Sequence, residues 1–384
     1  MTMNKTNIII TGGGTGGHLF PGIAAAQGLQ ERLPACKIMF IGTRRHLDKS
    51  TLARYPFTLR FIKCSGLKGK GIAARITGLI QILPAVLSSI RLIRSHRPVL
   101  ILGVGGYVTG PVLLAGKILG IPTCIHEQNS VPGMANKLLA RFVDRIFLSI
   151  PVDEKIFPPH KTILTGNPVR REILRVSEKQ KDEKTEKRTI LILGGSQGAH
   201  SINMLMIKAA GLIKKNLDTP FLLLHQSGSK DLEQVRRCYR EMGIEAQVEE
   251  FFDDMAAAYE QADLVVSRAG ATTLAELAVL GLPALLIPYP YAADNHQEMN
   301  GLHYQKGGGA ILLKQSDLTG KILAGEITSL LNDPKKLHSM RDCMKELGRP
   351  EATRLLVDNC LQVIQDTYSD LKINFQNNTT ETHV

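Results

Sequence analysis

The residues best suited to chemistry in this chain lie in two glycine-rich segments of the same kind. Residues 8–18 have the sequence IIITGGGTGGH and residues 190–200 have the sequence ILILGGSQGAH. Each segment is an apolar run of strand length, then glycines, then a helix-like stretch. Such glycines let backbone N–H groups approach a phosphate, and the following helix N-terminus adds a partial positive charge. One such loop is a weak signal, but two of them predict two nucleotide-binding-type domains that face each other across a cleft.

Two further segments of the first half place glycines or polar groups at strand ends. The cluster Gly103–Pro111 follows the apolar run 99–102, and the sequence IHEQN ends another strand at Asn129. These glycines could merely permit tight strand-to-helix turns. Because three such strand ends fall in one domain, we favour a wide anion-binding site there.

In the second half, the sequence SRAGATTLAE at 267–276 follows a strand and opens a helix. Thr272 and Thr273 would place hydroxyls near a pyrophosphate, and Glu276 could accept hydrogen bonds from ribose hydroxyls. A threonine with a glutamate downstream is also an ordinary helix-start signature. The polar stretch 288–300 that follows is rich in the hydrogen-bonding side chains that a sugar needs.

No Asp-x-Asp triplet occurs, so the usual carboxylate pair that holds a metal against a nucleotide diphosphate is missing. We interpret Asp253 and Asp254 as helix caps. We expect no metal and no cofactor. A leaving diphosphate would then be stabilised by helix N-termini and by a cationic or hydroxyl side chain.

Two other classes of function remain open on the residues alone. Gly12, Gly14 and Gly17 satisfy G-x-G-x-x-G, and Arg44 and Arg45 could suit a 2′-phosphate, which would fit an NADP-dependent oxidoreductase. The absence of G-K-[ST] excludes a P-loop. The excess of 47 basic over 35 acidic residues, a net charge of +12, would also fit a non-enzymatic protein that binds nucleic acid or a membrane.

Short apolar strands alternate with helical patterns, which predicts parallel sheets covered on both faces, that is, two doubly wound α/β domains. The expected strands are 7–11, 37–41, 58–62, 99–102, 123–126, 145–148, 163–164, 189–193, 221–225, 247–250, 264–267, 284–287 and 310–312. Helices are expected at 19–33, 72–96 and 334–371. The charged stretch 177–188 is typical of a linker or surface loop.

We predict Rossmann-like domains at 1–168 and 169–350, a helix after residue 351 that packs back on the first domain, and a frayed tail. The six scattered cysteines form no C-x-x-C pair, and no secretory signal precedes the first strand, so a reducing, cytoplasmic compartment is expected.

In combination, these segments resemble the MurG family of N-acetylglucosaminyltransferases. The matching motifs run in order from about residue 8 to 300: GGGTGGHLFPG, SGLKGKG, GVGGYVTGP, HEQN, TGNPVR, GGSQGA, FFDDMAAAY, SRAGATTLAE and PYAADNHQEMN. The resemblance implies a GT-B fold and an inverting, metal-independent transfer of GlcNAc. The donor would be UDP-GlcNAc, and the acceptor would be the C4 hydroxyl of MurNAc in undecaprenyl-diphosphate-MurNAc-pentapeptide. This step converts lipid I to lipid II in peptidoglycan synthesis.

The resemblance also implies which residues bind the donor. Ser196 and Arg170 would contact the nucleotide diphosphate, Phe252 would border the uracil, and Glu276 would hold the ribose. Gln297 and Asn300 would contact GlcNAc hydroxyls, and His296 stands where some relatives carry glutamine. The remaining substrate-binding residues implied are Thr15, Gly16, Gly17, Asn129, Ala271, Thr272, Thr273, Leu274 and Ala275.

For the acceptor, the implied residues are Gly13, Gly14, Gly105, Gly106 and Tyr107. His18 is our candidate for the general base, because an imidazole titrates near working pH, although it could instead only position the loop. Glu127 is the second candidate and could equally be structural. Asn129 would face the reacting groups.

An apolar helix with a basic border predicts a peripheral membrane contact. Residues 76–90 are too few for the roughly 20 that a spanning helix needs. They are flanked by Lys63, Lys68, Lys70, Arg75, Arg91, Arg94, His96 and Arg97. Such a helix suits an anionic lipid surface on the cytoplasmic face of the inner membrane, although an ordinary core helix is the alternative. Other cell-wall synthesis proteins are candidate partners, and nucleic acid is not.

Overall fold

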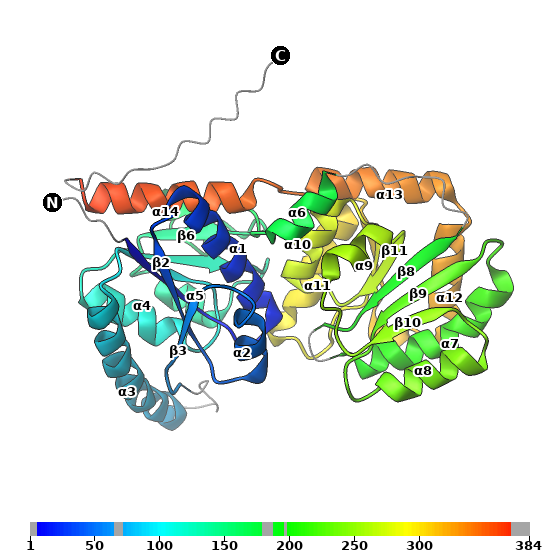
Figure 1. Ribbon diagram of the computed structural model, residues 1–384, viewed down its shortest axis with the longest axis horizontal. Helices are drawn as coiled ribbons and strands as arrows, with labels where there is room; N and C mark the ends of the chain where they lie inside the picture. The colour runs from blue at the N-terminus through cyan, green and yellow to red at the C-terminus, as the bar shows by residue number, and fades with distance from the viewer. Residues whose placement is uncertain (1–5, 65–71, 179–186, 196–197, 370–384) are drawn as a thin grey trace, which may run out of the picture. The chain divides into compact units, whose positions relative to one another are not determined.

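The computed structural model describes residues 6–64, 72–178, 187–195 and 198–369. The chain divides into two compact units, each with its own parallel sheet (Figure 1). The N-terminal unit contains residues 1–128, 132–168 and 351–384, and the C-terminal unit contains residues 129–131 and 169–350.

The N-terminal unit is built on a seven-stranded parallel sheet with strand order β3-β2-β1-β4-β5-β6-β7. Its strands are β1 Asn7–Thr11, β2 Lys37–Gly42, β3 Thr58–Phe61, β4 Leu100–Gly103, β5 Thr123–Glu127, β6 Arg145–Leu148 and β7 Thr162–Leu164. Its α-helices are α1 Gly16–Arg32, α2 His46–Leu52, α3 Ile72–His96, α4 Thr109–Ile118, α5 Met134–Leu139 and α14 Ala352–Thr367.

Alternation along the central strands builds a core on each face of this sheet. Ile8 and Ile10 of β1 pack with side chains of α1 and α14, whereas Ile9 packs with side chains of α3, α4 and α5. Successive strand residues point to opposite faces, so a continuous run of isoleucines fills both cores. Figure 1 shows α14, in red, beside α1, and these two helices contact each other.

The C-terminal unit repeats this plan with a six-stranded parallel sheet of order β10-β9-β8-β11-β12-β13. Its strands are β8 Arg188–Leu193, β9 Phe221–Gln226, β10 Ala246–Glu249, β11 Leu264–Ser267, β12 Ala284–Leu286 and β13 Ala310–Leu312. Its α-helices are α6 Arg171–Ser177, α7 His200–Asn216, α8 Leu232–Glu241, α9 Met255–Gln261, α10 Ala271–Leu280, α11 His296–Lys306, α12 Gly320–Leu331 and α13 Pro334–Leu347.

In both units the direction of strand order reverses beside the first strand, between β1 and β4 and between β8 and β11. The loops that follow neighbouring strands diverge at such a point, and ligands of doubly wound sheets bind there. The glycine-rich segments follow β1, β4 and β8, and the segment SRAG follows β11. The fold therefore places every predicted phosphate loop at a switch point.

One predicted helix is wrong in extent. The stretch 334–371 forms two helices, α13 and α14, with a break at Gly348–Glu351. Pro350 explains the break, since proline lacks an N–H donor and restricts the residue before it. Of the predicted linker, residues 179–186 lie outside the described residues, as does the predicted frayed tail, residues 374–384. No helix in the described part of the chain is both long and apolar enough to cross a membrane.

We expect α14 to stabilise the N-terminal unit. Leu356 is fully buried in the core that α14 shares with α1, so Leu356→Ala should lower the free energy of unfolding by about 2–5 kcal/mol. The control is Gln365→Ala, because Gln365 lies on the same helix and is exposed. Urea denaturation measures both variants, and equal midpoints for the two would contradict this packing role.

Candidate functional site

At the switch point of the N-terminal unit, the loops after β1 and β4 touch through their backbones. A Cβ atom on Gly106 would lie 2.6 Å from the carbonyl oxygen of Gly13. Gly13, Gly14, Gly105 and Gly106 all have positive φ angles, from 86° to 132°. Side chains at these positions would be strained, and one at Gly106 would also collide with the other loop. The structure thus brings the four predicted acceptor glycines together.

Asp48 and Arg45 hold the first glycine loop in place. The buried carboxylate of Asp48 accepts hydrogen bonds from the N–H of Gly14 at 2.8 Å and from the N–H and hydroxyl of Thr43. Arg45 donates to the carbonyl oxygen of Gly14 at 2.8 Å. Arg45, one of the two arginines that could have bound a 2′-phosphate, therefore binds the protein's own loop, which weakens the oxidoreductase hypothesis.

His18 lies in the first turn of α1, directly beside these loops. Its Nδ1 is 3.3 Å from Oε1 of Gln128, and a Cβ atom on Gly105 would lie 2.6 Å from the same nitrogen. Thr15 precedes α1 and is exposed with Gly17, whereas Gly16 is buried. The N–H groups of this first turn point out of the helix end and suit an anion. Tyr107, from the second loop, is 63% exposed.

Two residues that we did not predict, His126 and Gln128, lie behind His18. Both are buried. Gln128 donates through Nε2 to the carbonyl oxygen of Val104 at 2.9 Å and lies 3.0 Å from Nδ1 of His126. Burial lowers the pKa of His126 to about 4, so its imidazole is neutral at physiological pH. The polar residues behind the glycine loops form a continuous hydrogen-bonded row.

Glu127 points to the other side of the same strand. Its buried carboxylate accepts hydrogen bonds from the N–H of Gly133 at 3.0 Å and from Nδ2 of Asn136 at 2.8 Å. These bonds fix the start of α5. The geometry favours the structural alternative for Glu127 over a role as the base.

Asn129 and Asn300 are joined by a hydrogen bond. Nδ2 of Asn300 donates to Oδ1 of Asn129 at 3.1 Å, and Oδ1 of Asn300 accepts from the N–H and hydroxyl of Ser130. Asn300 is fully buried, whereas Asn129 is half-buried. Asn300 therefore holds the loop that presents Asn129, and its own contact with a GlcNAc hydroxyl stays a prediction.

In the C-terminal unit, Glu276 is the centre of a buried ionic cluster. Arg170 donates to its Oε1 through Nε at 3.2 Å and Nη2 at 2.9 Å, and the hydroxyl of Tyr259 donates to its Oε2 at 2.9 Å. Burial alone would lower the pKa of Arg170, but the charge and hydrogen bonds of Glu276, with smaller help from Glu172, raise it overall. Burial and the same carboxylate raise the pKa of Tyr259. Arg170 lies against the predicted ribose carboxylate, and Tyr259 was not predicted.

The first turn of α10 begins at Ala271, after Gly270 in the N-cap position with no side-chain cap. Ala271 and Thr272 are nearly buried and Thr273 and Ala275 are half-exposed. Leu274 is fully buried, and its N–H bonds to the carbonyl oxygen of Gly270. The side chain of Leu274 faces the core, and a substrate contact at this position stays a prediction.

Arg268 is a cation beside this turn that we did not predict. Its guanidinium donates to the carbonyl oxygens of Ile287 and Pro288 and to the hydroxyl of Ser201, at the start of α7. It also lies 5.5 Å from the ring centre of Tyr289. Burial lowers its pKa to about 10, so the guanidinium remains charged at neutral pH. A fixed positive charge thus lies between the starts of α7 and α10.

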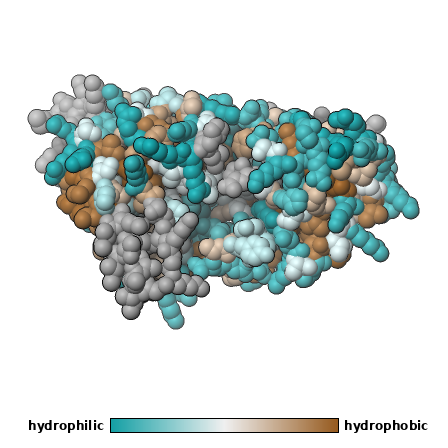
Figure 2. Space-filling model, turned by 90° about the horizontal axis from the view of Figure 1, so that it is seen from below, coloured by the Kyte–Doolittle hydropathy of each residue, from teal (hydrophilic) through white to brown (hydrophobic). Residues whose placement is uncertain are grey.

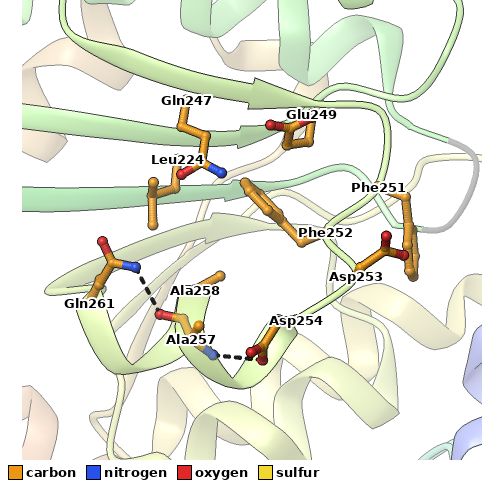
Figure 3. A pocket seen from close by; sticks show the side chains of 10 residues that line it. All are labelled: Leu224, Gln247, Glu249, Phe251, Phe252, Asp253, Asp254, Ala257, Ala258 and Gln261. Carbon is orange, nitrogen blue, oxygen red and sulfur yellow. Dashed lines mark hydrogen bonds between the residues drawn. The ribbon is translucent and has the colours of Figure 1, made fainter.

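Phe252 lines a cavity of about 310 Å³ beside β9, β10 and α9. Figure 3 shows its ring directed toward the strands, between Leu224 and Glu249. The N–H of Phe252 donates to Oε1 of Gln226, whose Nε2 donates to the carbonyl oxygen of Gly195. Gln226 therefore links the loop that carries Phe252 to the glycine loop after β8.

The other predicted residues of this unit have varied positions. Ser196 lies outside the described residues. Gln297 is half-buried, and its Oε1 accepts from the N–H of Tyr289 at 2.9 Å; Nδ1 of His296 bonds to the carbonyl oxygen of Ala293. Asp254 caps α9 by accepting from the N–H of Ala257, which confirms its interpretation as a cap. Within the residues described, no three His, Cys, Asp or Glu side chains cluster as metal ligands.

Comparison with known proteins shows which family this chain is similar to. Residues 8–148 match the N-terminal domain of glycosyltransferase family 28, and residues 189–356 match its C-terminal domain. A transferase of Desulfotalea psychrophila is 45% identical over 94% of this chain and 97% of its own length. One of an Anaeromyxobacter species is 42% identical over 93% of each. Both are named UDP-N-acetylglucosamine--N-acetylmuramyl-(pentapeptide) pyrophosphoryl-undecaprenol N-acetylglucosamine transferase.

A solved structure gives the same result. The crystal structure of Acinetobacter baumannii MurG is similar to this chain with a TM-score of 0.73 and 29% identity, covering 93% of this chain and 99% of the other. The two parallel α/β units are of the GT-B type. The chain therefore belongs to the MurG family of N-acetylglucosamine transferases, within glycosyltransferase family 28.

Proposed function

We propose that this protein transfers GlcNAc from UDP-GlcNAc to the C4 hydroxyl of MurNAc in undecaprenyl-diphosphate-MurNAc-pentapeptide, with inversion at the anomeric carbon. The main support is 45% identity, over 94% of the chain, to a transferase named for these substrates. The glycine loops, the buried carboxylate Glu276 and His18 supply groups that fit this chemistry.

The proposed reaction is a single displacement. The C4 oxygen of the acceptor forms a bond to C1 of GlcNAc while the bond from C1 to the β-phosphate oxygen breaks. The electron pair of that bond leaves with UDP, and the hydroxyl proton passes to the imidazole of His18. General-base assistance of this kind typically contributes about 10²–10⁴-fold in rate.

Donor binding is assigned to the C-terminal unit. Glu276 would accept hydrogen bonds from the ribose hydroxyls, held in position by Arg170 and Tyr259. Thr272 and Thr273, at the N-terminus of α10, would bind the diphosphate, and Phe252 would border the uracil. Gln297 and Asn129 would contact the sugar.

The negative charge on the leaving UDP would be stabilised by the start of α10 and by Arg268. A guanidinium already held by three hydrogen bonds needs little reorganisation when this charge develops. A metal is then not required for the leaving group.

We further propose that the N-terminal unit binds the cytoplasmic face of an anionic membrane. Exposed apolar residues recur four positions apart along neighbouring helices: Leu83 and Leu87 in α3, Leu114 and Ile118 in α4, and Met134, Leu138 and Phe142 in and after α5. Residues so spaced share a helix face. Figure 2 shows apolar surface where Figure 1 places α3 and α4.

Positive charges accompany this apolar surface, since Arg91, Arg94 and Arg141 are exposed on the same elements. Apolar residues bordered by cations suit an anionic lipid surface. Of the basic residues expected from the sequence, Lys68 and Lys70 lie outside the described residues, and so does the side chain of Arg75.

The activity is tested by transfer of radiolabelled GlcNAc from UDP-GlcNAc to a short-chain lipid I analogue in the presence of EDTA. We expect transfer by the wild type, and a loss of about 10²–10⁴-fold in kcat for His18→Ala with donor binding unchanged. Donor binding without transfer to this acceptor would contradict the assigned acceptor. Absence of UDP-GlcNAc binding would contradict the transferase itself.

A pair of carboxylate variants tests the donor site. Glu276→Gln should weaken UDP-GlcNAc binding at least about tenfold, because hydrogen bonds to a charged group contribute about 1.5–3 kcal/mol each. Glu172→Gln is the matched control, since Glu172 lies 3.7 Å from the same Arg170 but is 40% exposed. Calorimetric titration on folded variants measures both affinities, and equal losses would show that Glu276 has no special role.

Membrane binding is tested with vesicles that contain anionic lipid. Leu83→Glu combined with Leu87→Glu should reduce the bound fraction strongly, because two exposed apolar contacts become anions. Leu212→Glu is the control, since Leu212 is an exposed leucine on α7 of the other unit. Unchanged sedimentation of the double variant with vesicles would disprove this surface.

A further inference from the structure

Four polar groups behind the glycine loops form a row of hydrogen bonds. For each bond, the donor and the acceptor can be deduced atom by atom. The row runs from the carbonyl oxygen of Gly166 through His126 and Gln128 to His18, all within the N-terminal unit. His126 and Gln128, the inner members of this row, have no role in the function proposed above. The row matters because it determines which ring nitrogen of His18 carries a proton.

The fixed point is the carbonyl oxygen of Val104, which can only accept a hydrogen bond. One amide terminus of Gln128 lies 2.9 Å from it and must be the NH₂ group. The opposite terminus, Oε1, therefore faces Nδ1 of His18 at 3.3 Å. An amide oxygen only accepts, so Nδ1 of His18 must carry the proton that it donates.

The NH₂ group of Gln128 also determines the protons of His126. It faces Nδ1 of His126 at 3.0 Å, so Nδ1 must accept, and in the neutral imidazole the proton is on Nε2. Nε2 lies 3.3 Å from the carbonyl oxygen of Gly166 and 3.0 Å from the hydroxyl of Ser149, and both of these oxygens can accept that proton. The low pKa of the buried His126 keeps this ring neutral at physiological pH.

The position of the His18 ring is fixed as well as its protons. The ring lies so close to Gly105 that a Cβ atom there would be 2.6 Å from Nδ1. His126 and Gln128 are 0% and 2% exposed, so water does not compete for their hydrogen bonds. Because the carbonyl oxygen of Val104 orients the amide of Gln128, this buried row has one arrangement of ring protons in which every hydrogen bond has a donor and an acceptor.

We propose that Gln128 is a positioning residue, which holds His18 in the tautomer with Nδ1 protonated and so makes Nε2 the nitrogen that accepts the proton of the acceptor hydroxyl. This inference rests on the proposed transferase reaction and specifies how its base is prepared. Which nitrogen of a histidine acts as the base is set by the hydrogen bond that the other nitrogen makes. The hydrogen bond to Gln128 makes Nδ1 unavailable as the base. After Nε2 has accepted the proton, Nδ1 of the imidazolium still donates this hydrogen bond.

The tautomer is measured directly in wild-type protein labelled with ¹⁵N-histidine. Long-range ¹H–¹⁵N correlation separates protonated from unprotonated ring nitrogens, and the His18 signals are identified by their loss in His18→Gln. We expect Nδ1 protonated and Nε2 unprotonated in the neutral His18 ring. The opposite tautomer would overturn the proposal. Since this measurement needs no substrate, it can fail or succeed separately from the proposed function.

Kinetics of a double-mutant cycle test whether Gln128 acts through His18. Gln128→Met keeps the approximate side-chain volume but removes both amide groups, so kcat should fall about 10- to 100-fold with KM for UDP-GlcNAc little changed. In a His18→Ala background the same substitution should change the remaining rate by less than about twofold. Equal losses in both backgrounds would show a merely structural effect and overturn the proposal.

Two controls separate this effect from misfolding. Gln362→Met makes the same change on the exposed side of α14 in the same unit and should leave kcat unchanged. Calorimetric binding of UDP-GlcNAc to Gln128→Met should match the wild type. If the wild type transfers no sugar at all, the proposed function fails and the role of Gln128 in it fails too, whatever the tautomer.

Discussion

The structure of the N-terminal site depends on one close contact, that between the backbones of the two glycine loops after β1 and β4. Parallel strands deliver their carboxyl ends to the same edge of the sheet, and the strand order makes the two loops neighbours at the switch point. Only residues without a Cβ atom let the loops meet at Gly13 and Gly106. His18, Gln128 and Asp48 all take their positions from the backbone that this contact fixes.

In the C-terminal unit, the corresponding groups are held in position by hydrogen bonds and by ion pairing. Its glycine loop is tied to the Phe252 loop through Gln226, and the key carboxylate, Glu276, is held by Arg170 and Tyr259. A buried carboxylate is costly unless it is paired and hydrogen-bonded, and here both of its oxygens have partners. The orientation of Glu276 is therefore set before any ligand binds, and this kind of preorganisation favours ligand affinity.

Much of the fold followed from periodicity in the sequence. Apolar strand runs alternating with helices predicted all thirteen strands near their observed positions, because buried parallel strands are continuously apolar. The break between α13 and α14 was missed because the helical pattern resumes after Pro350. The site was predicted less completely. From the sequence HEQN we predicted roles for Glu127 and Asn129. Because successive residues of an extended segment point to opposite sides, His126 and Gln128 lie together on the other side. These two residues are the ones that lie behind His18.

The burial of individual site residues was a separate limit. Whether the side chain of Asn300 or Leu274 is covered depends on which side of its helix packs against the unit, and motif spacing does not specify this. Arg268 and Tyr259 acquire their roles only through contacts with distant segments, such as Ile287 and Glu276. Such long-range pairs cannot be deduced from one sequence, because many other pairings would satisfy the same side chains.

The place of α14 in the fold also bears on how the chain is made. Its buried residues complete the core beside α1, although they are encoded after the whole C-terminal unit. Domains generally fold as units and in order during synthesis, at about 5–20 residues per second. Here the first unit to leave the ribosome has an open apolar face until α14 is translated. The nascent N-terminal unit should therefore need protection by chaperones while the second unit is being synthesised.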